Sequence, residues 1–155
     1  MTTNILNVLK GGERIGIDTA PLIYFIENHP VYADVVAPVF ELIDDGSIVA
    51  VSSVITITEV LSQPLKLARR DVENAYRQIL LEHAHFDLLP VTIEIAERAA
   101  QLRAQYNLRT PDALQIATSL VAGCHAFLTN DIQLRRVTEL RILVLNDFIQ
   151  GSSAQ

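Results

Sequence analysis

The sequence predicts an α/β fold, a three-layer α/β/α sandwich around a central, mostly parallel sheet of four to five strands. Short apolar runs alternate with longer stretches of helical periodicity along the whole chain. The apolar runs lack polar/apolar alternation, which indicates strands buried on both faces of a parallel sheet. The 155 residues contain no internal repeat or linker, so we expect one domain over residues 1–155 with its core at about 14–148.

The composition narrows the class of protein. Half of the residues are hydrophobic and 19% are charged, which is typical of a folded chain, and no apolar run reaches the roughly 20 residues of a membrane span. The net charge of −6 argues against a non-specific polyanion binder but is compatible with a metal site built from carboxylates. A single cysteine and an N-terminus without signal-peptide features favour a cytoplasmic location.

In the first half of the chain, residues 14–18 are predicted to form a buried strand and residues 21–27 a short helix. The spacing of apolar residues predicts a second helix over 33–45, with Pro38 near its start and Gly46 suited to its end. A second strand follows at 48–52.

The middle of the chain is predicted to hold two helices and a third strand. Ser53 can cap a helix over 54–61, which Pro64 is expected to stop. An amphipathic pattern predicts one continuous helix over 65–81, and residues 86–89 form the third strand.

In the last third, Thr92 is expected to cap a helix whose apolar stripe ends at Tyr106. Thr110 and Pro111 suit the N-cap and first position of the next helix, which ends at Gly123. Its predicted buried face consists of Ala113, Leu114, Ala117, Leu120 and Val121. A fourth strand at 126–129, a short helix at 132–137 and a fifth strand at 141–145 complete the alternation.

Four acidic residues fall where ligand sites occur in such folds, beyond the carboxyl ends of the strands. Asp18 ends the first strand and Asp131 follows the fourth. Asp112 lies in the first turn of its helix, and Glu59 lies on the helix after the second strand. Each alone has an ordinary interpretation as a cap or a solvated residue. Together, four converging carboxylates repel one another unless a cation neutralises them, and oxygen ligands favour Mg²⁺ or Mn²⁺.

The motifs around these acids resemble those of the PIN-domain family, in its branch of VapC-type toxins. The resemblance covers the chain from about Ile15 to Leu145, with four motifs in the family's order. These motifs are Ile17-Asp18-Thr19 with Leu22-Ile23-Tyr24, Ser53-Val54-Ile55-Thr56 leading to Glu59-Val60-Leu61, Thr110-Pro111-Asp112-Ala113 with Ile116-Ala117, and Phe127-Leu128-Thr129-Asn130-Asp131.

The resemblance implies a metal-dependent endoribonuclease that leaves 5′-phosphate and 3′-hydroxyl ends. Asp18 and Asp112 are expected as principal ligands of Mg²⁺ or Mn²⁺, and Glu59 and Asp131 are expected to complete the shell. A bound metal ion would lower the pKa of a water and stabilise charge on the phosphate. The family is also expected to form homodimers and to pair with an antitoxin, which a groove around residues 21–45 can accept.

Several further residues are candidates for supporting roles. Thr19 and Thr129 match small hydroxyl positions near the family's site. Arg135 and Arg136 follow Asp131 closely enough to contact RNA phosphates, and Arg109 is placed similarly beside Thr110.

Two other classes of protein remain as alternatives. A catalytically inactive PIN-like module that only binds a protein partner would share the fold, but retention of all four acids argues against it. A receiver-type signalling domain is also doubly wound, but it needs an acidic pair at the first strand and a lysine after a late strand, and this chain has neither. The histidines and the cysteine lack the spacing of zinc ligands.

Overall fold

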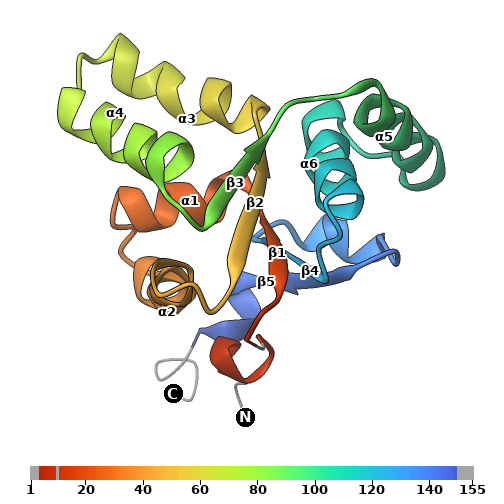
Figure 1. Cartoon of the computed structure of the whole chain (residues 1–155), viewed down its shortest axis with the longest axis horizontal. Coiled ribbons are helices and arrows are strands. Elements are labelled where there is room, and N and C mark those ends of the chain that lie inside the picture. Colours follow the sequence, from red (N-terminus) through yellow and green to blue (C-terminus); the bar gives the residue numbers. More distant parts are fainter. Residues whose placement is uncertain (1–3, 10, 150–155) are drawn as a thin grey trace.

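The computed structural model describes residues 4–9 and 11–149 and contains a five-stranded, fully parallel sheet (Figure 1). The order of the strands is β3-β2-β1-β4-β5. Their bounds are β1 (Arg14–Ile17), β2 (Val49–Ser53), β3 (Phe86–Leu89), β4 (Ala126–Thr129) and β5 (Arg141–Val144). β1 lies at the centre, and its Gly16 is in register with Val51 of β2 and Phe127 of β4. The predicted parallel sheet is confirmed.

Helices cover both faces of the sheet, so the predicted three-layer sandwich is also confirmed (Figure 1). On one face lie α1 (Thr19–Ile26), α2 (Ala33–Asp44), α3 (Ile55–Lys66) and α4 (Arg70–Arg77). On the other lie α5 (Ile93–Tyr106) and α6 (Thr110–Val121), of which α6 contacts β1, β2 and β4. The short helical turns are η1 (Ile5–Asn7), η2 (Gln78–Glu82), η3 (Ile132–Arg136) and η4 (Leu145–Phe148).

Each helical layer closes its own hydrophobic core over the sheet. The core beneath α1–α4 contains Leu22, Phe40 and Tyr76, and the core beneath α5 and α6 contains Leu102 and Ile116. Residues of the strands contribute to both cores because successive side chains point to opposite faces of the sheet. This arrangement explains why the strands are mostly apolar and show no alternation.

At Gly16, α6 packs closely on the central strand. A methyl group at this position would lie 2.0 Å from Ser119 Oγ and 2.7 Å from Phe127 Cδ1. Glycine therefore permits a close approach of α6 to the central strand, which brings the first turn of α6 near the end of β1.

The boundaries of α3 and α4 differ from the sequence prediction. α3 continues through Pro64 to Lys66, because the fixed φ of proline is helical and only one backbone hydrogen bond is lost. The helix predicted over 65–81 does not exist as one element. The chain breaks at Ala68, whose φ is +54°, and α4 begins at Arg70.

The start and the buried face of α6 also differ from prediction. Thr110 is the first helical residue and Arg109 occupies the N-cap position, without a side-chain cap. Gln115, Thr118 and Ser119 are buried, whereas Val121 is 39% exposed. The apolar stripe alone underestimated the burial because α6 is covered by the sheet on one side and by α5 on another.

Other local predictions are confirmed. Thr92 Oγ1 accepts a hydrogen bond from Ile95 N as the cap of α5. Gly46 has a φ of +80° just beyond α2, which stays helical through Pro38. Among the described residues, no helix is long and apolar enough to cross a membrane.

Candidate active site

Asp18 lies between the end of β1 and the start of α1. Its side chain caps that helix, with Oδ1 accepting a hydrogen bond from Thr19 N at 2.8 Å. Burial raises the pKa of Asp18 to about 6, although hydrogen bonds from Thr129 and Thr19 lower it; the charges of Asp112 and Glu59 raise it further. No positively charged group of the described residues is thus among the causes that shift the pKa of Asp18.

Two threonines connect the acidic residues to one another. Thr129, buried at the end of β4, donates its hydroxyl to Asp18 Oδ2 at 2.7 Å and accepts a hydrogen bond from Asp131 N at 3.0 Å. Thr19 donates its hydroxyl to Glu59 Oε1 at 2.7 Å. The Thr129 hydroxyl therefore connects the ends of β1 and β4, and the Thr19 hydroxyl connects the start of α1 to α3.

Asp112 and Asp131 approach from the other side of the site. Asp112, in the first turn of α6, forms a salt bridge with Arg109. Asp131 caps η3, its Oδ1 accepting a hydrogen bond from Gln133 N at 2.9 Å. Both positions follow from the parallel topology, which places helix starts and strand ends at one edge of the sheet.

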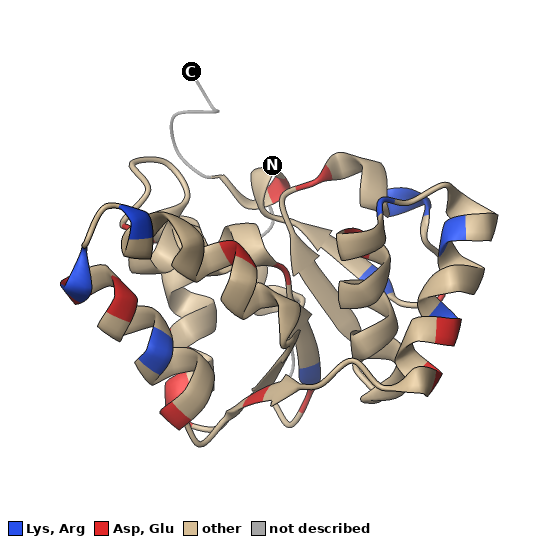
Figure 2. Ribbon diagram, turned by 90° about the horizontal axis from the view of Figure 1, so that it is seen from above, with Lys and Arg blue, Asp and Glu red and all other residues tan. Residues whose placement is uncertain are grey.

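All four predicted acids line one hollow of about 350 Å³. It lies at the edge of the sheet where the strands end; Figure 2, viewed from above, shows acidic segments between the two helical layers. The other lining residues are Ala20, Tyr24, Arg109, Thr129 and Asn130. The structure therefore brings together residues separated by more than 110 positions in the chain.

The hollow offers the donor chemistry of a hard divalent cation, since its four carboxylates supply only oxygen. In the described part of the chain, however, no three acidic, histidine or cysteine side chains lie close enough to hold one ion together as they stand. Asp18, Glu59 and Asp112 each accept instead from a side chain, namely Thr129, Thr19 and Arg109 in that order. The side chains are thus of the chemical type that binds such an ion. They must rearrange from these hydrogen bonds before they can bind it together.

The other predicted site residues lie close to the hollow or outside it. Arg136 lines a smaller adjoining hollow of about 140 Å³ together with Asp112 and Asp131. Arg135 points elsewhere and pairs with Asp147. Thr19 and Thr129 both contact the acids, as described above.

Gln115, three residues after Asp112 in α6, does not line the hollow. It is 2% exposed, accepts a hydrogen bond from Ser53 N at 3.1 Å and donates to Thr56 Oγ1 at 2.6 Å. It therefore joins α6 to the end of β2 and the start of α3. Its polar character in an otherwise apolar stripe was the signal for such a buried link.

Comparison of the sequence with models of known protein families identifies the family to which this fold and this acidic hollow belong. A family model of the PIN domain matches residues 15–140. The chain belongs to the PIN-domain family. No curated protein matches the chain.

Solved structures that share this fold include toxins and toxin–antitoxin complexes. VapBC2 from Rickettsia felis, bound to a promoter DNA fragment, matches with a TM-score of 0.66 and 15% identity, over 84% of this chain and 98% of that one. A toxin–antitoxin complex from Klebsiella pneumoniae gives 0.64 and 21%, over 84% and 97%. VapC20 from Mycobacterium tuberculosis, described as a sarcin–ricin loop cleaving toxin, gives 0.59 and 14%, over 73% and 86%. The fold is that of VapC-type PIN proteins.

Proposed function

We propose that this chain is a divalent-metal-dependent endoribonuclease and the toxin of a type II toxin–antitoxin pair. The observation that carries the proposal is the convergence of Asp18, Glu59, Asp112 and Asp131 on one hollow in a chain of the PIN-domain family. Four carboxylates at one edge of the sheet suit a hard cation, which can activate a water molecule as the nucleophile. The reaction class is hydrolysis of an RNA phosphodiester bond.

In this proposal Asp18 and Asp112 are the principal ligands, and Glu59 and Asp131 complete the shell directly or through water. Bound Mg²⁺ or Mn²⁺ would supply an activated water and stabilise charge on the phosphate. The chain's own contribution is orientation: Thr129 fixes one oxygen of Asp18 and the backbone of Asp131, and Thr19 fixes Glu59.

Binding of the RNA backbone needs positive charge beside the acids, since the chain as a whole has a net charge of −6. Arg136 is suited to this role because it lines the hollow that adjoins Asp112 and Asp131. Arg135 lies on the same short helix, but Asp147 neutralises it. Arg136 is therefore the stronger candidate for phosphate contact.

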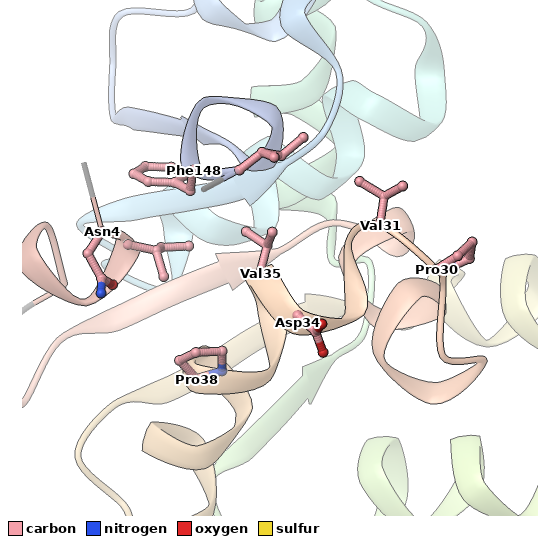
Figure 3. Close-up of a pocket in the computed structure, with 9 residues that line it drawn as sticks. Asn4, Pro30, Val31, Asp34, Val35, Pro38 and Phe148 are labelled. Atoms are coloured by element: carbon pink, nitrogen blue, oxygen red, sulfur yellow. The ribbon is translucent and has the colours of Figure 1, made fainter. Parts of the chain in front are cut away.

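A groove beside α2 suits the proposed antitoxin. A hollow of about 470 Å³ is lined by the loop before α2, by α2 itself and by segments near both ends of the described chain (Figure 3). Pro30, Val31, Val35, Pro38 and Phe148 contribute apolar groups to a mixed lining that also contains Asn4 and Asp34, and Val31 is 49% exposed. The related solved complexes are of toxins with antitoxins. We further expect a homodimer that works in the cytoplasm.

The proposed activity is tested by incubating the purified protein with a mixed RNA pool in Mn²⁺, in Mg²⁺ and in a chelator. Asp18→Asn and Asp112→Asn are compared with the wild type, and Asp147→Asn, which removes an exposed carboxylate paired with Arg135, is the matched control. The proposal expects metal-dependent fragments with 5′-phosphate ends from the wild type and the control only. Equal cleavage by all four proteins, or by none, would contradict it.

A second candidate function is a PIN-like module that only binds a protein partner. The observation that favours it is that, within the described residues, no three potential ligands stand ready to hold an ion together. Binding of Mn²⁺ distinguishes the two, because a module without catalysis has no need of a metal. Absence of both metal binding and cleavage would leave the interaction module as the better interpretation.

A further inference from the structure

Arg109 places a positive charge directly on one of the proposed metal ligands. Its Nε lies 3.0 Å from Asp112 Oδ2 and its Nη2 lies 3.4 Å from Asp112 Oδ1, so the planar guanidinium faces both carboxylate oxygens. The Asp112 side chain is 13% exposed and that of Arg109 is 77% exposed. The carboxylate is thus shielded while the arginine approaches it from solvent.

The surroundings of Arg109 distinguish it from an ordinary ion pair on a helix surface. It is the one basic residue among the described residues lining the hollow that contains all four acids. The pKa of Arg109 is raised by Asp112 first, and Asp131 and Asp18 raise it further. Three of the four acids of the hollow therefore favour the charged guanidinium.

We propose that Arg109 is an exchangeable internal cation, which neutralises Asp112 in the metal-free protein and is displaced when a divalent ion takes that carboxylate. This inference rests on the proposed metal-dependent function. Both oxygens of Asp112 face the guanidinium, so a metal ion that chelates the two oxygens from that side must displace it. Arg109 thereby raises the concentration of divalent ion that is needed to fill the site.

The geometry makes this exchange energetically feasible. Water screens an ion pair whose cation is largely exposed, so only a weak attraction holds the guanidinium in place. Because Arg109 is largely exposed, it can rotate into water without burying its charge. It then remains at the rim of the hollow, near the phosphate-contacting position assigned to Arg136.

The first test is calorimetric titration of Mn²⁺ into the metal-free full chain, with Arg109→Gln compared with the wild type. Removing a competing cation from an acidic hollow is expected to tighten Mn²⁺ binding by about three- to tenfold. Arg77→Gln is the matched control, because Arg77 Nε also lies 3.0 Å from a carboxylate, that of Glu73, but on α4. The control is expected to change the Kd by less than about twofold.

The outcomes separate this inference from the function on which it rests. Equal Mn²⁺ affinity of the wild type and Arg109→Gln would overturn the role of Arg109 and leave the nuclease proposal standing. No binding by the wild type or by Arg109→Gln would overturn both. Binding by Arg109→Gln alone would support the inference in its strongest form.

The second test follows the guanidinium itself by NMR. The Nε–H signal of Arg109, assigned by its loss in Arg109→Gln, is monitored while diamagnetic Mg²⁺ is added. Displacement predicts that this signal shifts and saturates together with Mg²⁺ binding, whereas the Arg77 signal stays in place. An unchanged Arg109 signal at saturating Mg²⁺ would show that the salt bridge persists and would overturn the exchange.

Discussion

The Asp18 side chain combines burial with proximity to other carboxylates, and this has a measurable effect on stability. Its pKa is raised from 3.8 to about 6, with desolvation as the main cause. The folded protein therefore retains a proton that the unfolded chain releases at lower pH. The free energy of unfolding is expected to fall as the pH rises from about 4 to about 6, and then to level off.

We predict that Asp18→Asn removes this pH dependence when metal is absent. A shift of this size corresponds to about 2–3 kcal/mol, so the variant should gain that much stability relative to the wild type between about pH 4 and pH 7. Urea denaturation in the presence of a chelator measures the difference. Asp147→Asn is the control, and parallel pH curves for Asp18→Asn and the wild type would contradict the explanation.

At this scale the sequence predicted which acids converge but not how each is held. The placement of Asp18 and Asp131 at strand ends follows from the parallel topology, and the four acids do line one hollow. The pairing of Asp112 with Arg109 depends on the side-chain conformation at the start of α6, which periodicity does not specify.

At the scale of elements, Gln115 links α6 to β2 and α3. Gln115→Leu leaves the backbone N–H of Ser53 without its acceptor in a buried place, which should cost about 1–3 kcal/mol of stability. Chemical denaturation measures this loss. Gln105→Leu on the exposed side of α5 is the control, and an equal effect of the two substitutions would show that the buried link contributes nothing.

The contact of α6 with β1 at Gly16 provides a second prediction for elements. Gly16→Ala should lower the free energy of unfolding by about 1–3 kcal/mol, because its methyl group would overlap Ser119 Oγ. Gly11→Ala is the control, since nothing lies within 4 Å of a methyl group there. A thermal or urea unfolding curve identical to that of the wild type would contradict the close approach.

Most elements could be predicted from the sequence, and the errors have identifiable causes. Caps such as Thr92 and glycine stops such as Gly46 are local, so they were found correctly. The break at Ala68 was missed because alanine in a left-handed conformation leaves no mark in the sequence. Leu65 and Leu67, which flank the end of α3, are 54% and 58% exposed.

At the scale of the whole molecule, the three-layer architecture follows from the apolar strands and their alternation with helices. The reactivity of the Cys124 thiol can be used to measure how often the folded protein opens. Cys124 is buried, and burial raises the pKa of its thiol to about 11, so little reactive thiolate exists near neutral pH.

We predict that a thiol reagent at about pH 8 modifies Cys124 only as fast as the folded protein opens. The rate should rise with urea in parallel with global unfolding, and modification in denaturant should be complete. Rapid labelling of the native protein would contradict the burial of this part of the fold.

We propose that four carboxylates from four elements form a single metal site. Calorimetric titration of Mn²⁺ into the wild type and into Asp18→Asn, Glu59→Gln, Asp112→Asn and Asp131→Asn tests this proposal. We predict that every substitution weakens the same binding event, with the largest losses for Asp18→Asn and Asp112→Asn. Wild-type affinity in both of those variants would contradict it.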